Sequence, residues 1–171
     1  ICEKTDTSGT EFAFYSTQTE TVKSERTIED GTYLITNGDQ TLAVNSGADG
    51  SGIQKVSKDG KSSKKAFYIA YNEKKAVYTI CSVYSGRFLD ANLGDVVPGT
   101  VVSASGTEAG KALQRCWKIE KDKNGQMYIR NAANNQMLGS AADGELITVP
   151  ADDERAVRWT LEQSDFYWSE K

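Results

Sequence analysis

The chain has 171 residues, 38% of them hydrophobic, which is enough for one core but too little for two. Its net charge of -4 and its pI near 5.0 give no general attraction to phosphate backbones, so we expect no nucleic-acid partner. No apolar run is long enough to span a bilayer, so no membrane insertion is expected. The chain starts at Ile1 without a signal peptide, which favours a processed piece of a longer protein.

Residues 1–27 are rich in Thr, Ser and Glu, a composition typical of an N-terminal extension or linker. Within them, residues 11–15 favour a strand, because Phe12 and Phe14 would share one face and need a surface to cover. The aromatic residues of the C-terminal extension, 164–171, have the same need. We expect these two apolar patches to pack on each other near the N-terminus; two disordered tags are the alternative.

The stretch Val77–Ile119 consists of short runs rich in β-branched or aromatic residues, each stopped by Gly, Pro, Ser or Asn. This pattern predicts four short strands joined by tight turns. Similar patterns lie on both sides, with markers 42 to 50 residues apart in the same order: an opening Tyr, a Leu in the second strand, a Gly before the third and a closing aromatic. An internal repeat follows. The markers are Tyr33, Leu42, Gly52 and Phe67; Tyr78, Leu89, Gly99 and Trp117; and Tyr128, Leu138, Gly144 and Trp159.

A tyrosine-led strand, S-G-x-x-L-D in a turn and a closing W-x-I, in threefold order, resemble the ricin-type β-trefoil (ricin B-like lectin) domain. The opening Asp30–Tyr33, D-G-T-Y, is similar to copies in secreted multidomain bacterial proteins. The resemblance implies an all-β trefoil domain over residues 28–163, with three pseudo-repeats at about 31–73, 74–123 and 124–163. About twelve strands are expected, half closing a barrel and half capping it with hairpins. Another β-barrel or a sandwich is the alternative.

The sugar site of that family combines an Asp after the second strand, an aromatic ring further on and an Asn just before Q-x-W. A carboxylate accepts from sugar hydroxyls, an amide donates and accepts, and a ring stacks on C–H groups. Asp90 alone matches the first position, where the outer repeats have Ala43 and Gly139. Leu113 stands where the Asn is expected, and the Gln of Q-x-W is absent or shifted. The resemblance is therefore good for the fold and poor for the sugar site.

The carbohydrate site is predicted to be degenerate and, at best, confined to the middle repeat. There Asp90 would be assisted by Asn92, Arg87 or Tyr84. The alternative is that Asp90 only holds its own turn through backbone hydrogen bonds.

Five lysines crowd into eleven residues of the first repeat, with one Asp to offset them. Such a run is usually a solvated loop. The alternative is a loop that contacts an anionic glycan or wall polymer, with an affinity that falls with salt. These lysines are Lys55, Lys58, Lys61, Lys64 and Lys65.

The chain contains three cysteines, Cys2, Cys81 and Cys116. The trefoil resemblance makes the first and fourth strands of a repeat neighbours, which implies that Cys81 and Cys116 point to the same side. A disulfide between them is therefore a candidate, and two unlinked thiols are the alternative. Cys2 would be unpaired or bonded elsewhere.

Catalysis has little support, because the chain contains no His and no outstanding pair of carboxylates. Asp152, Asp153 and Glu154 lack the alternating oxygen spacing and the Gly of a calcium loop. We therefore expect no enzyme activity, no cofactor and no metal in this chain. Any catalytic activity would reside in another part of a longer parent protein.

The most favoured function is a carbohydrate-binding module of a secreted or cell-surface bacterial protein, monomeric, with a glycan or cell-wall polysaccharide as partner. The alternative is a trefoil that contacts proteins, through adhesion, domain packing or protease inhibition. A glycan array separates these classes, because the fold does not fix the function.

Overall fold

A computed structural model describes residues 26–91, 99–107 and 113–166 of the chain. These residues form thirteen β-strands in one sheet and two short 3-10 helices, η1 (Ser63–Lys65) and η3 (Leu113–Arg115). The strands are β1 (Gly31–Asn37), β2 (Gln40–Val44), β3 (Ser51–Ser57), β4 (Phe67–Asn72), β5 (Val77–Ser82), β6 (Phe88–Asp90), β7 (Thr100–Val101), β8 (Ser103–Ser105), β9 (Trp117–Lys121), β10 (Met127–Asn131), β11 (Met137–Ser140), β12 (Leu146–Val149) and β13 (Thr160–Gln163).

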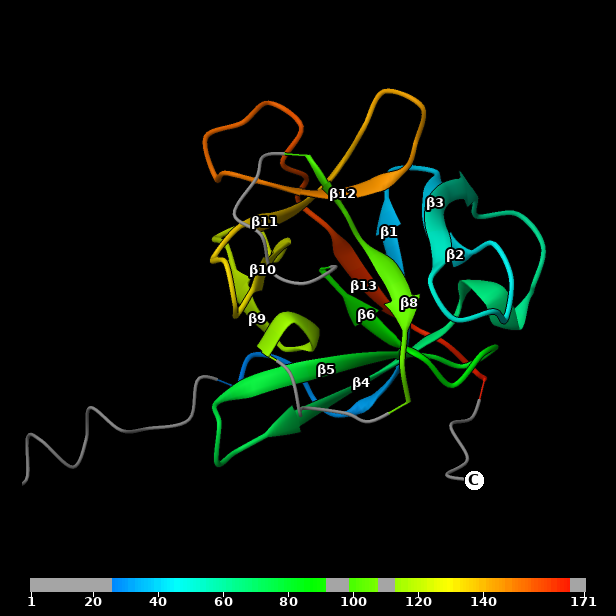
Figure 1. Ribbon diagram of the computed structural model, residues 1–171, viewed down its shortest axis with the longest axis horizontal. Coiled ribbons are helices and arrows are strands. Elements are labelled where there is room, and N and C mark those ends of the chain that lie inside the picture. The colour runs from blue at the N-terminus through cyan, green and yellow to red at the C-terminus, as the bar shows by residue number, and fades with distance from the viewer. Residues whose placement is uncertain (1–25, 92–98, 108–112, 167–171) are drawn as a thin grey trace, which may run out of the picture.

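Six of these strands close a barrel (Figure 1). Antiparallel pairing runs from β13 to β1, β4, β5, β9 and β10. The ring closes where Met127 and Trp159 exchange two backbone hydrogen bonds of 2.7 and 2.8 Å. The predicted all-β architecture with a closed barrel is thus confirmed, and closure leaves the barrel strands without an open edge.

Within the barrel, each of three strand pairs places a residue of an opening strand opposite a closing aromatic residue. These pairs are Tyr33 with Phe67, Tyr78 with Trp117, and Met127 with Trp159.

Between those pairs, apolar residues two positions further along face each other across the seams. These pairs are Ile69 with Ile80, Ile119 with Ile129, and Leu161 with Ile35.

One marker of the third copy was wrongly placed by the sequence pattern. The pairing register puts Met127 opposite Trp159, and Met127 is buried. Side chains alternate along a strand, so the next residue, Tyr128, faces outward and is only half-buried. In the third copy, Met127 therefore occupies the position that Tyr33 and Tyr78 occupy in the first two copies.

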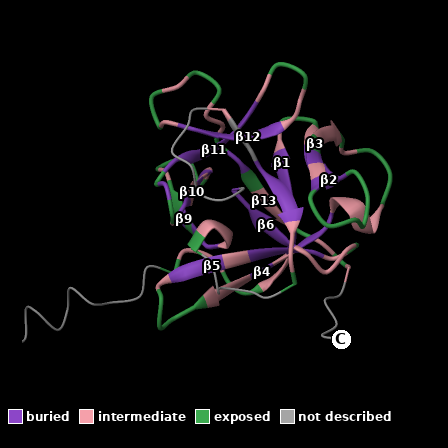
Figure 2. Cartoon of the chain, in the orientation of Figure 1, coloured by how far each residue is buried: buried purple, intermediate pink, exposed green. Residues whose placement is uncertain are grey.

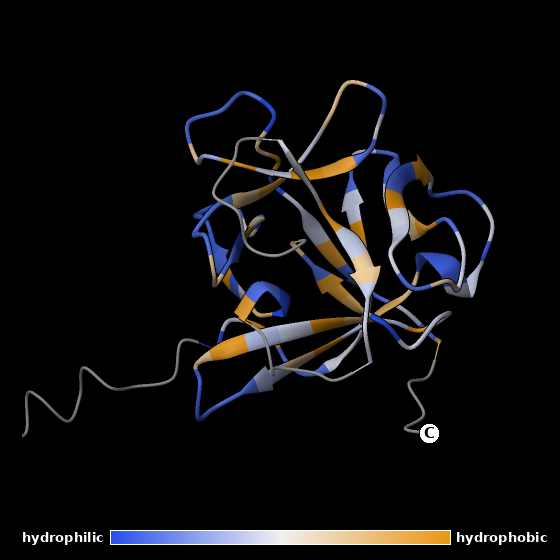
Figure 3. Cartoon of the chain, viewed as in Figure 1, coloured by the Kyte–Doolittle hydropathy of each residue, from blue (hydrophilic) through white to orange (hydrophobic). Residues whose placement is uncertain are grey.

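The core lies inside the barrel and under the hairpins, where purple buried segments and orange apolar ones coincide (Figures 2 and 3). The two closing tryptophans are fully buried, and their indole groups are satisfied. Trp117 Nε1 donates to the Leu89 carbonyl at 3.1 Å, and Trp159 Nε1 to that of Leu138 at 3.3 Å. The first repeat has Phe67 instead, which packs without a donor.

The turns before the third strands need a left-handed residue, because Gly50, Gly99 and Gly144 all have positive φ. The marker glycine of the first copy is thus Gly50, whereas Gly52 lies inside β3. In the middle copy the third strand is divided: β7 pairs with β12, whereas β8 pairs with β3 and β6.

Hydrogen bonds attach the first and last described segments of the chain to the barrel. The Tyr78 hydroxyl lies 2.5 Å from the backbone nitrogen of Thr27, and the Thr27 hydroxyl donates to the Ile119 carbonyl at 2.8 Å. At the other end, the Ser164 amide donates to the Thr32 carbonyl at 2.8 Å. The predicted strand at 11–15 and its packing on the C-terminal aromatics lie outside the described residues.

Across the described parts of the chain, no helix has the length and apolar character needed to cross a membrane.

Candidate functional site

Asp90, the residue predicted to bind sugar, ends β6 with a side chain that is 3% exposed. Its Oδ1 accepts a hydrogen bond from the Gln114 side-chain amide at 3.0 Å. Its Oδ2 accepts from Arg115 Nε at 2.9 Å, which forms an ion pair. The carboxylate is therefore engaged inside the chain, rather than presented to a ligand.

The helix η3 brings these two partners to Asp90. Gln114 and Arg115 belong to η3, and the Ala91 amide donates to the Gln114 carbonyl at 3.1 Å. The sequence pattern did not predict either residue as a partner of Asp90. The available signal was the place of Arg115 two residues before Trp117, where the family pattern has its Gln, with Gln114 one position earlier.

Arg87 points to the first repeat rather than to Asp90. Its Nε donates to the Gly47 carbonyl at 3.2 Å, and its Nη1 lies 3.5 Å from Asp49 Oδ1. The same Asp49 oxygen accepts from the Gly106 amide at 2.9 Å and the Ser105 hydroxyl at 3.1 Å. These bonds, that of Gly106 first, hold the pKa of Asp49 below its usual value.

Tyr84 offers an exposed aromatic ring on the turn between β5 and β6, with 43% of its surface accessible. The ammonium group of Lys64, from the first repeat, lies 5.1 Å from the ring centroid. This distance is within the range of a cation–π contact. Arg87 belongs to the same turn, but its guanidinium is directed to Gly47 and Asp49, so Lys64 is the cation that contacts the ring.

The four predicted sugar contacts thus do not converge on one group. Asp90 is bonded to η3, Arg87 to the loop at Gly47 and Asp49, and Tyr84 contacts Lys64. Asn92 lies outside the described residues.

The five lysines do not form one patch either. Lys55 donates to Asn37 Oδ1 at 3.4 Å, on the side of the β1–β2 turn. Lys64 turns to Tyr84 and donates weakly to the Asn45 carbonyl at 3.4 Å.

The other three lysines, Lys58, Lys61 and Lys65, line one cavity of ≈ 390 Å³ with Leu34 and Phe166. Lys58 pairs with Glu162 at 2.8 Å and Lys61 with Asp165 at 2.6 Å, and these contacts lower the pKa of both carboxyls. Lys65 donates to backbone carbonyls at 2.6 and 3.0 Å. Much of the positive charge is therefore balanced locally, which weakens the case for an anionic ligand.

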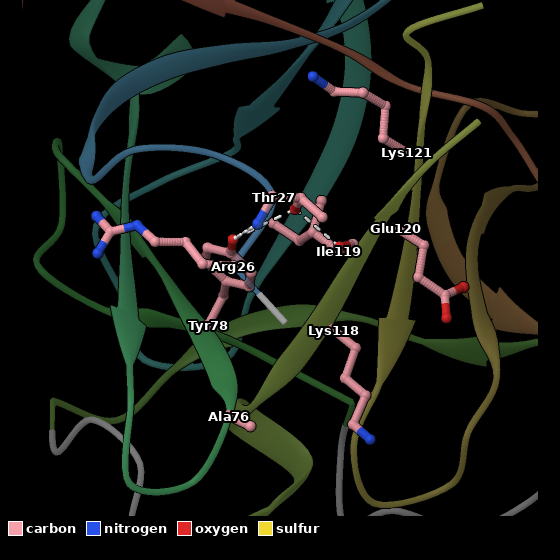
Figure 4. A pocket seen from close by; sticks show the side chains of 8 residues that line it. All are labelled: Arg26, Thr27, Ala76, Tyr78, Lys118, Ile119, Glu120 and Lys121. Carbon is pink, nitrogen blue, oxygen red and sulfur yellow. Dashed lines mark hydrogen bonds between the residues drawn. The ribbon is translucent and has the colours of Figure 1, made fainter. Parts of the chain in front are cut away.

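A second cavity, of ≈ 400 Å³, lies where the described chain enters the barrel (Figure 4). Residues 26–27, the end of the β4–β5 turn and β9 line it. The hydroxyl of Tyr78 contacts the amides of both Thr27 and Ile28. The Tyr78 and Thr27 hydroxyls of this cavity are thus hydrogen-bonded to the backbone, which argues against a role for them in binding a ligand.

The predicted disulfide is wrong, because Cys81 and Cys116 are both buried thiols. Tyr78 faces Trp117, so the antiparallel register places Cys116 opposite residue 79, two positions from Cys81. Cys81 instead faces Tyr68 and Phe88. Burial raises the pKa of Cys81 to about 12 and also raises the pKa of Cys116. Cys2 lies outside the described residues.

The acidic run at residues 152–154 is a turn held by a local ion pair. Asp153 Oδ1 accepts from the Arg155 Nε at 3.0 Å, and Oδ2 from Nη2 at 2.9 Å. Residues 26–91, 99–107 and 113–166 contain no group of three or more His, Cys, Asp or Glu side chains that could hold a metal ion.

The fold and sequence together define a ricin-type lectin-like domain. The model of the family described as ricin-type beta-trefoil lectin domain-like matches residues 63–150, just over half of the chain. The chain therefore belongs to this family.

Solved structures show the same fold at low sequence identity. A mosquitocidal holotoxin is 21% identical with a TM-score of 0.71, over 82% of this chain and 18% of the toxin chain. The Polyporus squamosus lectin, solved with a human-type influenza-binding epitope, is 14% identical with a TM-score of 0.69, over 81% of this chain and 50% of the lectin. ThreeFoil, a designed threefold-symmetric protein, is 17% identical with a TM-score of 0.70, over 79% of this chain and 100% of its own.

The chain thus spans less than two thirds of the length of the toxin and of the lectin. At sequence identities this low, the similarity shows that the folds are alike but does not show that the functions are. Comparison with curated proteins finds no match.

Proposed function

We propose that this chain is a non-catalytic carbohydrate-binding module with its sugar site on the middle repeat. Membership of a lectin-like family supports the class of function, as does the likeness to a lectin solved with a glycan. A glycosidase also lies among the similar structures, Clostridium thermocellum exo-beta-1,3-galactanase, and the chain spans only 30% of it. Domains of this kind are typically non-catalytic, so catalysis is assigned to other parts of such proteins.

The single observation that carries the placement is the exposed ring of Tyr84 with the Lys64 ammonium group beside it. An aromatic face packs on the C–H face of a sugar, and Lys64 supplies a donor for its hydroxyls. Of the residues described, Tyr84 and Leu113 are the large hydrophobic ones with high exposure, and Tyr84 alone is aromatic.

In this proposal Asp90 positions the middle repeat rather than contacting the sugar. Its carboxylate fixes Gln114 and Arg115, and its burial keeps it away from a ligand. The inherited sugar carboxylate has become a structural group. The resulting site is shallow, so its affinity for one sugar is weak.

The proposal extends to the organisation of the chain. Three pseudo-repeats, at about 31–73, 74–123 and 124–163, are supported by the matching registers of the barrel pairs. They are also supported by the likeness to a designed threefold-symmetric protein. We place the domain outside the cell in a bacterial protein, as a monomer, and this placement rests on the family resemblance of the sequence.

A glycan array followed by calorimetric titration of the best glycan tests the site. Replacing Tyr84 with Ala should weaken binding about tenfold, because the stacking surface is lost. Tyr84→Phe is the matched control and should bind nearly as well, since it keeps the ring and loses only the hydroxyl. Equal affinities for Tyr84→Ala and the parent chain would place the sugar elsewhere.

An array on which no glycan binds would reject the carbohydrate proposal. The protein-contact alternative would then lead, and the exposed side chain of Leu113, which is 58% accessible, favours it.

A further inference from the structure

A polar cavity of ≈ 520 Å³ lies beside the loop that joins β12 to β13. Its volume falls in the range of about 300–1,000 Å³ that small-molecule sites occupy. Two alanines and a valine of that loop contribute apolar lining. The polar lining consists of Asn37, Gln126, Tyr128, Asp153, Glu154 and Arg158.

Tyr128 is the feature of this cavity that the barrel does not require. The positions equivalent to it, which follow the inward residues Tyr33 and Tyr78, are Leu34 and a threonine. Leu34 lines the lysine cavity of the first repeat, beside the loop that precedes β4. Two repeats therefore place a loop against the outward residue of the opening strand, and only the third presents a phenol there.

Arg158 contacts Tyr128 through both its Nε and its guanidinium plane. Its Nε donates to the Tyr128 hydroxyl at 2.6 Å, and its guanidinium carbon lies 5.2 Å from the ring centroid. The Asp122 carboxylate lies 3.5 Å from the same Nε. Because these contacts restrict the guanidinium, a ligand would bind it with a smaller loss of side-chain entropy.

Two further polar side chains that line the cavity, Glu154 and Gln126, can form hydrogen bonds with a ligand. Within the described part of the chain, no hydrogen bond engages the Glu154 carboxylate or the side-chain amide of Gln126. Asp153 differs, because Arg155 binds both of its oxygens and lowers its pKa to about 2. Glu154 and Gln126 therefore offer an acceptor and a donor–acceptor pair to a ligand.

We propose that this cavity is a second carbohydrate site, which takes a neutral disaccharide unit through Glu154, Gln126 and the Tyr128–Arg158 pair. Vicinal hydroxyls need neighbouring donors and acceptors, and the cavity supplies a carboxylate, an amide and a guanidinium around one phenol. The ligand class rests on the carbohydrate binding proposed above, whereas the location is independent of Tyr84.

This cavity is also separate from the position that corresponds to Asp90 in the third repeat. That position is Gly139, where an added Cβ would lie 2.3 Å from the Arg155 carbonyl oxygen. Neither Gly139 nor Arg155 lines the cavity.

Amide NMR titrations of the ¹⁵N-labelled chain with lactose, cellobiose and diacetylchitobiose test the inference. At least one disaccharide should shift the amides of Gln126 and of residues 151–158. Glu154→Gln should weaken this binding about tenfold, because it removes a charged acceptor. Glu73→Gln is the matched control: it makes the same change at an exposed turn between β4 and β5, outside the cavity, and should leave the affinity unchanged.

The outcomes separate this inference from the proposed function. Shifts confined to the surroundings of Tyr84 would overturn the second site and leave the first one standing. Equal affinities of Glu154→Gln and Glu73→Gln would also overturn it. If none of the three disaccharides shifts any amide, the second site is rejected, and the proposed function then depends on the glycan array alone.

Discussion

The closing tryptophans of the barrel contribute hydrogen bonds as well as buried apolar area. Trp117 is fully buried, and its indole N–H donates to the Leu89 carbonyl at 3.1 Å. Trp159 does the same for Leu138, whereas Phe67 shows that the equivalent position can pack without a donor. The hydrogen bond and the apolar packing of the tryptophan are therefore separable.

Trp117→Phe should lower the free energy of unfolding by about 1–3 kcal/mol, because it removes the indole hydrogen bond to the Leu89 carbonyl. Trp117→Ala should cost about 3–5 kcal/mol, since a cavity is added. Urea denaturation of both variants measures the two steps. Equal losses for Phe and Ala would show that the hydrogen bond, and not the ring, dominates at this site.

The buried thiol of Cys81 makes stability depend on pH in the alkaline range. Its pKa is about 12 in the folded chain, against an ordinary value of 9.0, because burial disfavours the thiolate. Below about pH 9 the thiol is protonated in both states and does not change the free energy of unfolding. As the pH rises from 9 towards 12, the thiol ionises in the unfolded chain but not in the folded one, which stabilises the unfolded chain. The sign is a loss of folding stability with rising pH, by up to about 1.4 kcal/mol per pH unit.

Cys81→Ala should remove this contribution, so its urea midpoint should fall less steeply between pH 8.5 and 10 than that of the parent chain. Comparing the two slopes cancels the tyrosines and lysines that titrate in the same range. Parallel slopes would contradict a strongly raised thiol pKa.

At the scale of elements, the β11–β12 hairpin shows why the third repeat lacks a carboxylate like Asp90. Gly139 pairs with Ile147 of β12 and also bridges to Ala156 of the following loop. An added Cβ would lie 2.3 Å from the Arg155 carbonyl oxygen, which is backbone and cannot swing away. The missing sugar-site residue thus reflects the close approach of a loop to the hairpin.

Gly139→Ala should destabilise the chain by about 1–3 kcal/mol, because the loop at Arg155 must move to admit a methyl group. Thermal unfolding followed by circular dichroism measures the loss. The matched control is Gly47→Ala, where an added Cβ meets no atom within 4 Å and the φ angle is ordinary. A Gly139→Ala variant as stable as the Gly47→Ala variant would mean that the loop moves freely.

At the scale of the whole molecule, the repeat of markers in the sequence was enough to predict the closed all-β barrel. Leu42, Leu89 and Leu138 are all fully buried, as their place in the repeat required. The register was not predictable in the third repeat, because Met127 and Tyr128 are both apolar enough to open the strand. Only pairing with Trp159 decides between them.

The candidate site was less predictable than the fold. Whether Asp90 faces solvent depends on Gln114 and Arg115, which lie 24 and 25 residues away and approach it only in the folded chain. The disulfide prediction was wrong for a similar reason. The alternation of side chains tells which face of a strand a cysteine lies on, but not which residue of the next strand it faces. The cavity at Tyr128 had no sequence signal, because its lining comes from three separate turns.

Barrel closure predicts that the three proposed repeats unfold as one unit. Ile35, Ile80 and Ile129 occupy matching seam positions and are each 0% exposed. Replacing any one of them with Val should lower the free energy of unfolding by about 0.5–1.5 kcal/mol and shift a single transition. Tryptophan fluorescence reports on Trp117 and Trp159, in the second and third repeats, and on Trp168 near the end of the chain, so this test uses a chain with Trp168→Phe. Far-ultraviolet circular dichroism reports on all three repeats. The two probes should give coincident urea curves for every variant, because each repeat depends on its neighbours for two of its barrel pairings. A second transition in the Ile35→Val variant, seen by circular dichroism alone, would mean that the first repeat unfolds separately and that closure through β13 is weak.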